Sequence, residues 1–308
     1  MLAFVVVGAR LAQYVCAMVL MGAPLFFLYG LPQTGVPAEL TWTRPLLRAA
    51  AAALLSSATI ALFAQTAVMV DSVPEAFKLD NLATVLTNGH FGIAIIGRLT
   101  LSLLALLALM FMRPSRRLWI SMTVLGTGIV ASFAWTGHGA SDEGLGGLIH
   151  TISDVLHLIA AAVWMGALAA FALLLLRSHK AADEELSVLY RALAKFSGIG
   201  SAVVAVLLAT GLINTWYMVG PSHVLDMAGS VYGQLLLTKL ALFTLMLGLA
   251  AANRFAHTPR LGAVLAGKAP TRAAVAALRR SVVLEASTAL IVVALVAVLG
   301  TLAPPMSQ

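Results

Sequence analysis

The stretch TISDVLHLIAAAVWMGALAAFALLLL, residues 151–176, decides the fold. Its apolar part is long enough to cross a bilayer, since a membrane helix needs about 20 mostly apolar residues. Yet the stretch begins with polar groups, Asp154 and His157, and a further histidine, His150, stands one residue before it. It therefore predicts a membrane helix with titratable or metal-binding groups at one end.

The composition of the whole chain is that of a membrane protein. Of its 308 residues, 61% are hydrophobic and 10% are charged, whereas soluble domains have about 25% charged residues. Spans in lipid must satisfy their own backbone hydrogen bonds, so they are helices. We predict an all-α, polytopic protein with one membrane domain over residues 1–308. Its eight spans are expected at roughly 5–29, 47–70, 91–112, 117–137, 152–176, 197–219, 231–254 and 282–302.

Several classes of protein are excluded by what the sequence lacks. The net charge of +7 sits in short loops between spans, which indicates membrane orientation and not nucleic-acid binding. A single cysteine, Cys16, excludes a CxxC metal or redox site. The chain has no nucleotide-binding or hydrolase motif such as GxxxxGK[ST], HExxH or GxSxG. We therefore expect no enzyme, and we interpret the N-terminal apolar run as a retained helix and not as a signal peptide.

The basic residues predict the orientation. The connections after spans one, three, five and seven contain 15 Lys and Arg residues, and the other three connections contain one, Lys78. Basic loops stay in the cytoplasm. Both termini are therefore predicted to lie outside the cytoplasm, in the periplasm, and five of the seven histidines would lie at that outer side.

The first four helices (about 5–137) and the last four (about 152–302) resemble each other. VLMGAP at 19–24 matches VWMGAL at 163–168, QTAVMV at 65–70 matches NTWYMV at 214–219, and FGIAIIGRL at 91–99 matches YGQLLLTKL at 232–240. The offsets are 144, 149 and 141 residues. Four helices per half give both halves the same orientation, so the sequence predicts two parallel four-helix repeats, and substrate sites often lie at such an interface.

The polar residues near the mouth of the fifth span predict a metal site. On a helix, His150, Asp154 and His157 share one face. Imidazole and carboxylate suit transition metals, including copper. His138 lies across the same loop, at the end of the fourth span. The alternative is that these groups are interfacial, with Asp154 favoured by the helix dipole.

Other residues inside the spans are further candidates. Met165 and Met218 have repeat-matched partners, and thioethers favour Cu(I), although methionine also fills gaps in apolar cores. Arg98 and Lys239 are repeat-matched charges that could extend to the interface, pair with a carboxylate or bind an anion. Glu285 is expected to pair with a cytoplasmic base. Asn214 and Asn253 are candidates for hydrogen bonds between helices.

Four segments resemble the CopD family of copper-resistance membrane proteins. DVLHLIAAAVWMGAL at 154–168 is similar to its His…Trp-x-Gly signature. FGIAIIGRL is similar to its FG…RL helix. VYGQLLLTKLALFTLMLGLAAANRF at 231–255, followed by Pro259, is similar to its YG…K…NR…P segment, and LRRSVVLEASTALIVVALVAVLGTLAPP at 278–305 is similar to its last helix. The resemblance covers about residues 89–305.

The resemblance implies an eight-helix protein of the bacterial cytoplasmic membrane that moves copper from the periplasm towards the cytoplasm and contributes to copper homeostasis and resistance. It implies copper contact at His157. From the residues themselves we expect copper to enter at the cluster of His157, His150, Asp154 and His138 and to pass along packing lined by methionines near Met165. Trp164, on the same helix face as His157, is expected to shape the entrance. The resemblance also implies a separate periplasmic copper-binding CopC-like partner, because no such domain is fused here. A homo-oligomer remains open.

Two alternatives to transport stay open. Two histidines at similar depth can bind haem b axially, which would make the protein a membrane electron carrier, with His157 paired to His90 or His138. The other is a scaffold that docks a periplasmic copper chaperone and moves no metal.

Overall fold

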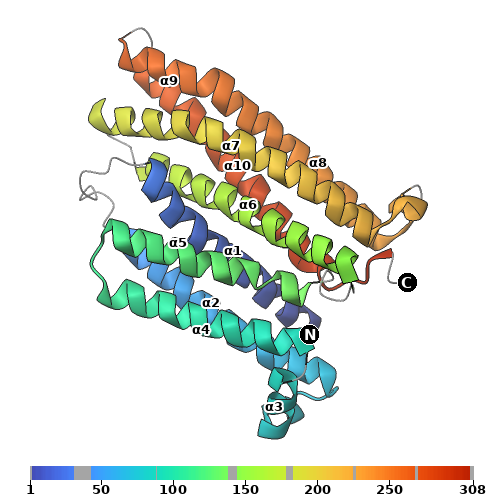
Figure 1. Cartoon of the computed structure of the whole chain (residues 1–308). Helices are drawn as coiled ribbons and strands as arrows, with labels where there is room; N and C mark the ends of the chain where they lie inside the picture. Colours follow the sequence, from blue (N-terminus) through green and yellow to red (C-terminus); the bar gives the residue numbers. More distant parts are fainter. Residues whose placement is uncertain are drawn as a thin grey trace.

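The computed structural model describes residues 2–30, 43–87, 89–137, 144–177, 183–224, 227–267 and 270–305, and these are almost entirely helical (Figure 1). The position of His138 lies outside these residues. The helices are α1 (Leu2–Gly30), α2 (Thr43–Met69), α3 (Leu79–Thr87), α4 (Gly89–Phe111), α5 (Arg116–Ala131), α6 (Gly144–Arg177), α7 (Asp183–Met218), α8 (Val231–Ala252), α9 (Thr258–Leu265) and α10 (Thr271–Leu299). A π-helical turn, Asn253–His257, joins α8 to α9.

The eight predicted spans are confirmed, because eight helices of the described chain are long and apolar enough to cross a membrane. The helices are longer than the apolar runs that predicted them. α6 begins at Gly144, α7 at Asp183 and α10 at Thr271, each well before the expected start. Hydropathy marks the part of a helix that lies in hydrocarbon, whereas backbone hydrogen bonding continues into the polar region. The short helix α3, in the connection between α2 and α4, was not predicted.

The helices are arranged as two groups side by side, α1, α2, α4 and α5 in one and α6, α7, α8 and α10 in the other (Figure 1). The two chain ends lie at the same end of the bundle. The contacts within the groups largely correspond: α1 packs on α2 as α6 packs on α7, and α4 packs on α5 as α8 packs on α10. This correspondence is the one expected of two parallel repeats.

The groups meet where α1 crosses α6, at Gly22 and Gly166. A Cβ atom added to Gly166 would lie 2.2 Å from the Cα of Gly22, and one added to Gly22 would lie 2.1 Å from the carbonyl oxygen of Ala162. Backbone therefore lies against backbone, as small residues allow in membrane helices. The two glycines are repeat partners, because 166 minus 22 gives the 144-residue offset of their motifs.

The repeat is broken at one interface. In the first group α2 packs closely on α4, whereas the corresponding helices of the second group, α7 and α8, make few contacts with each other. The space between α7 and α8 is instead bordered by two cavities, one above the other along α6. Most of the residues that line them belong to the second group, so the two halves do not provide equivalent sites.

Candidate functional site

The cavity nearer the chain ends has a volume of about 190 Å³ and is lined by residues of α1, α6, α7, α8 and α10. We call it the outer cavity. Its wall is mostly apolar, but several polar or charged side chains converge on it, among them Asp154, His157, Asn214 and Lys239. A mostly apolar cavity with a few convergent polar groups is the usual form of a small-ligand site.

The ring orientation of His157 is set by Thr210 of α7. The Nδ1 of His157 lies 2.9 Å from the Oγ1 of Thr210. That hydroxyl donates its one proton to the carbonyl oxygen of Val206, 2.6 Å away. Nδ1 must then be the donor in its contact with Thr210, so the Nε2 of the neutral ring carries a lone pair. Metal-binding histidines are typically oriented in this way, by a hydrogen bond from the other ring nitrogen.

Asp154 lies one turn before His157 and brings negative charge to the same cavity. The Nδ2 of Asn214 donates to its Oδ1 at 3.4 Å, so the predicted bridge between α6 and α7 is confirmed. The charges of Asp154 and Lys239 are close enough to interact. Lys239 thus brings a basic group to the cavity wall that Asp154 also lines.

Two thioethers complete the outer cavity. Met218 of α7, which the repeat had singled out, lines it together with Met18 of α1. The hydroxyl of Tyr232 donates to the Sδ of Met218 at 3.3 Å, which holds the side chain in place. The cavity therefore combines an imidazole, a carboxylate and thioethers, a donor set that suits copper. Sequence reasoning missed Met18, because α1 aligns with α6 and was not expected to contribute to the same site.

His150 and Met165, the other predicted copper ligands of α6, do not line the outer cavity. The ring of His150 is buried and stacks on that of Tyr217, with centroids 4.9 Å apart, and it does not line the outer cavity. Met165 is partly buried between two apolar clusters. In the part of the chain that the structure describes, no three His, Cys, Asp or Glu side chains are close enough to hold a metal ion together. The expected grouping of His150 with Asp154 and His157 is therefore not formed.

Trp164 and Glu285 lie deeper than expected. Trp164 is seven residues beyond His157, which at 1.5 Å per residue is about 10 Å further along α6. It therefore lines a second, deeper cavity and not the outer cavity. Glu285 is buried, and its carboxylate accepts hydrogen bonds from Trp164 and Asn253 instead of pairing with a base. Asn253 thereby joins the π-helical turn to α10, as predicted for an interhelical amide.

Arg98 has a structural role in the first group. It is buried, and its guanidinium donates to the Oε1 of Gln13 at 2.7 Å and to Ser132 and Thr136. It also lies over the ring of Phe133, 3.9 Å from the centroid. Its hydrogen-bond partners are neutral, so the expected pairing of Arg98 with a carboxylate is not formed among the described residues. Gln13 occupies the position that His157 has in the other half, which leaves the first group without an equivalent imidazole.

The haem alternative finds no second ligand among the described histidines. His90 is exposed at the start of α4, and no residue of α4 lines the outer cavity that contains His157. The other candidate ligand, His138, lies outside the described residues.

Comparison with known proteins gives consistent matches. Residues 1–148 match the family model "Copper resistance protein D-like, N-terminal domain", and residues 190–299 match "Copper resistance protein D". A protein of Pseudomonas syringae pv. tomato named copper resistance protein D is 37% identical over 309 residues, covering 97% of each chain. Inner membrane protein YebZ of Escherichia coli (strain K12) is 30% identical, covering 85% of this chain and 87% of its own. Copper transport protein CutJ of Bacillus subtilis (strain 168) is 31% identical over 135 residues, 24% of its length. No solved structure matches the chain.

Proposed function

Since the chain belongs to the copper resistance protein D family, whose members handle copper, we propose that it carries copper across the cytoplasmic membrane from the periplasmic side. The observation that supports this most directly is the outer cavity. There the Nε2 lone pair of His157 is made available by Thr210, next to Asp154 and the thioether of Met218. Copper is the substrate of this site, with His157 as its principal ligand.

The basic residues support the direction. Arg113, Arg116 and Arg117 lie at the α4–α5 end of the bundle, opposite the two termini, and the positive-inside rule assigns that end to the cytoplasm. The outer cavity, at the end of the termini, would then face the periplasm. Copper would be received from a periplasmic copper-binding protein of the CopC type.

A route inward follows one face of α6. Asp154, His157 and Ala161 line the outer cavity, and Trp164 and Leu168 line the deeper one. Between them lies an apolar cluster from α6, α7, α8 and α10 that includes the buried Met246. Such a cluster closes the route to ions at rest, and its thioether is the soft ligand that Cu(I) prefers. We propose that movement of α8, which is little packed against α7, opens it.

Lys239 suits a site that must also release its ion. A fixed ammonium group near Asp154 weakens the attraction of the cavity for a cation, and transport requires binding strong enough to enter and weak enough to leave. Lys239 is the repeat partner of Arg98. In the first group the basic residue at this position is held by hydrogen bonds to neutral groups such as Gln13, whereas in the second group it lines the outer cavity.

The test is copper accumulation in cells expressing the full chain, His157→Ala or His90→Ala, at matched membrane abundance. Loss of the ligand is expected to lower protein-dependent uptake at least about tenfold, in line with the cost of disturbing a metal ligand. His90→Ala is the matched control, since it removes an exposed outer histidine remote from the cavity. Equal copper content in cells with and without the protein would refute transport and favour the chaperone-docking scaffold.

A further inference from the structure

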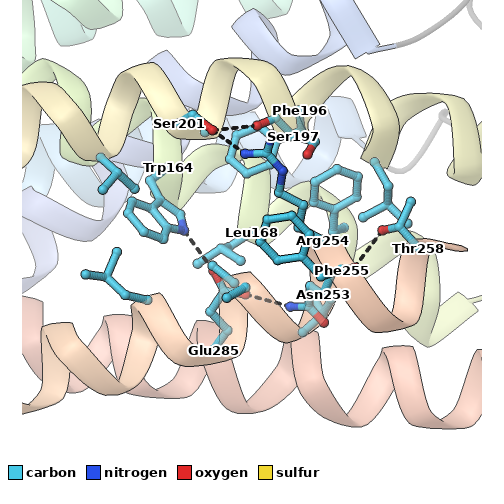
Figure 2. A pocket seen from close by; sticks show the side chains of 18 residues that line it. Trp164, Leu168, Phe196, Ser197, Ser201, Asn253, Arg254, Phe255, Thr258 and Glu285 are labelled. Carbon is cyan, nitrogen blue, oxygen red and sulfur yellow. Dashed lines mark hydrogen bonds between the residues drawn. The ribbon is translucent and has the colours of Figure 1, made fainter.

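A second cavity, which we call the inner cavity, lies deeper along α6 and has a volume of about 290 Å³ (Figure 2). It is lined by residues of α6, α7, α8, the π-helical turn, α9 and α10. Glu285 and Asn253 are buried in its wall, 3% and 8% exposed. π-helical turns inside α-helices are frequent at functional sites, so the break at Asn253–His257 is a reason to ask what this cavity binds.

The carboxylate of Glu285 is held by neutral donors. The Nε1 of Trp164 donates to its Oε1 at 2.9 Å, and the Nδ2 of Asn253 donates to its Oε2 at 2.7 Å, as Figure 2 shows. The Oδ1 of Asn253 is buried and has no hydrogen-bond partner among the described residues. The site thus has an acid group and an unused acceptor next to each other.

Among the described residues, no basic side chain forms an ion pair with the carboxylate of Glu285. α6 contributes only Trp164 and apolar residues to the cavity, and α7 contributes Ser197 and Ser201 as its polar groups. The π-helical turn contributes Arg254, whose guanidinium donates to the Oγ of Ser201 and not to Glu285. His257, at the end of that turn, does not line the cavity, and α10 contributes no other titratable group to it. A buried carboxylate without a positive partner is costly, so the site needs a cation or a proton.

The chemistry of the lining favours a proton. No residue that lines the inner cavity has an imidazole or a sulfur atom, the ligands that copper prefers. Both oxygens of Glu285 already accept hydrogen bonds, which leaves few oxygen ligands for a hard metal cation. A proton needs one carboxylate oxygen, and an acid O–H would then find an acceptor in the amide oxygen of Asn253 after rotation of that side chain.

We infer that Glu285 binds and releases one proton in the inner cavity, and that this exchange accompanies the passage of copper along α6. This rests on the proposed function for its coupling, but not for the proton site itself. The carboxylate takes the proton from water in the cavity and returns it to water, so no other reactant is needed. Since Trp164 lies two turns beyond His157 on one helix, a shift of α6 or α8 would affect both cavities together.

The first experiment needs no copper. Infrared difference spectra of the purified full-length protein in lipid, recorded while the pH is changed, are expected to show the C=O band of a protonated carboxyl group that is lost in Glu285→Gln. Glu75→Gln, which removes an exposed carboxylate paired with Lys78, is the control that retains it. Trp164→Phe keeps the acid and removes one donor, so it should shift the band. An unchanged band in Glu285→Gln would overturn the proton site.

The second experiment tests coupling in proteoliposomes that contain a pH-sensitive dye. Added copper is expected to move protons across the membrane with the wild-type protein but not with Glu285→Gln. Copper flux without proton movement in the wild type would refute the coupling and leave the proposed function standing. Absence of copper flux in the wild type, with the infrared band present, would refute the proposed function and the coupling while the proton site stands.

Discussion

In the proposed function, Thr210 acts on copper only through His157. Its hydroxyl is committed to Val206 as a donor and to His157 as an acceptor, and this pair of hydrogen bonds fixes which ring nitrogen faces the outer cavity. A side chain of the same shape that lacks the hydroxyl would leave the ring free to rotate or to place its proton on Nε2. The arrangement at this residue therefore decides whether the imidazole is a ligand at all.

We expect Thr210→Val to weaken copper binding about tenfold, which is the low end of the cost of removing such a supporting hydrogen bond. The measurement is titration of the purified protein with a competing copper chelator. A merely structural role would lower the melting temperature without changing affinity. Thr238→Val, whose hydroxyl bonds only to its own helix at an exposed position, is the control. Equal affinities in both variants would show that the contact does not orient the imidazole.

At the same scale, the sequence predicted part of the outer cavity. Helical periodicity places Asp154 and His157 on one face, and both line it. The same periodicity includes His150, but its ring is held aside by Tyr217 of another helix, and no pattern within α6 shows this. Met18 was not predicted, because its position in the wall of the outer cavity depends on how α1 crosses α6.

Among the elements, α1 and α6 form the central contact of the molecule. Their crossing depends on two residues without side chains, Gly22 and Gly166, which allow the backbones to touch. Residues of α6 line both cavities, so the position of the two cavities relative to the first group is set at this crossing.

Gly166→Ala should force α1 and α6 apart, because the new methyl group would overlap the backbone of Gly22. We expect a loss of about 1–3 kcal/mol of stability, typical of an overpacked interior, and a lower melting temperature in detergent. Gly248→Ala on α8 meets nothing within 4 Å and is the matched control. An unchanged melting temperature in Gly166→Ala would contradict the close crossing.

The number and order of the helices followed from hydropathy because each span must be apolar in itself. Their true starts did not, since α7 continues for about four turns before its apolar part, and polar helix has no hydropathy signal. The sparse contact between α7 and α8 was also unpredictable, because the matched motifs QTAVMV and NTWYMV imply equal packing in both halves.

For the whole molecule, orientation follows from the separation of charge between its two ends. In the described chain, Arg10 lies near the ends of the termini but is not free to direct insertion, because its guanidinium donates to the carbonyl oxygens of Gly300 and Thr136. It thereby ties α1 to the end of α10. At the opposite end Arg113, Arg116 and Arg117 are exposed, and we expect that end to face the cytoplasm.

Thiol labelling of intact cells tests this orientation. Cys16→Ser first removes the single cysteine, and Thr301→Cys or Pro114→Cys, both at exposed positions, then marks one end each. A reagent that does not cross membranes should label Thr301→Cys in intact cells, and Pro114→Cys only after the membrane is opened. The reverse pattern would place the outer cavity in the cytoplasm and invert the proposed direction of transport.

The contact between Gly22 and Gly166 also has a meaning for descent. Residues that correspond in the two halves touch each other, which is the arrangement found on the two-fold axis of a symmetric dimer. Two copies of a four-helix ancestor that dimerised through this glycine would produce the present chain when their genes fused. Fusion allows the two copies to diverge, and the two groups do differ: the first contains the hydrogen-bonded Arg98, whereas the second has few contacts between α7 and α8 and contributes most of the lining of the two cavities.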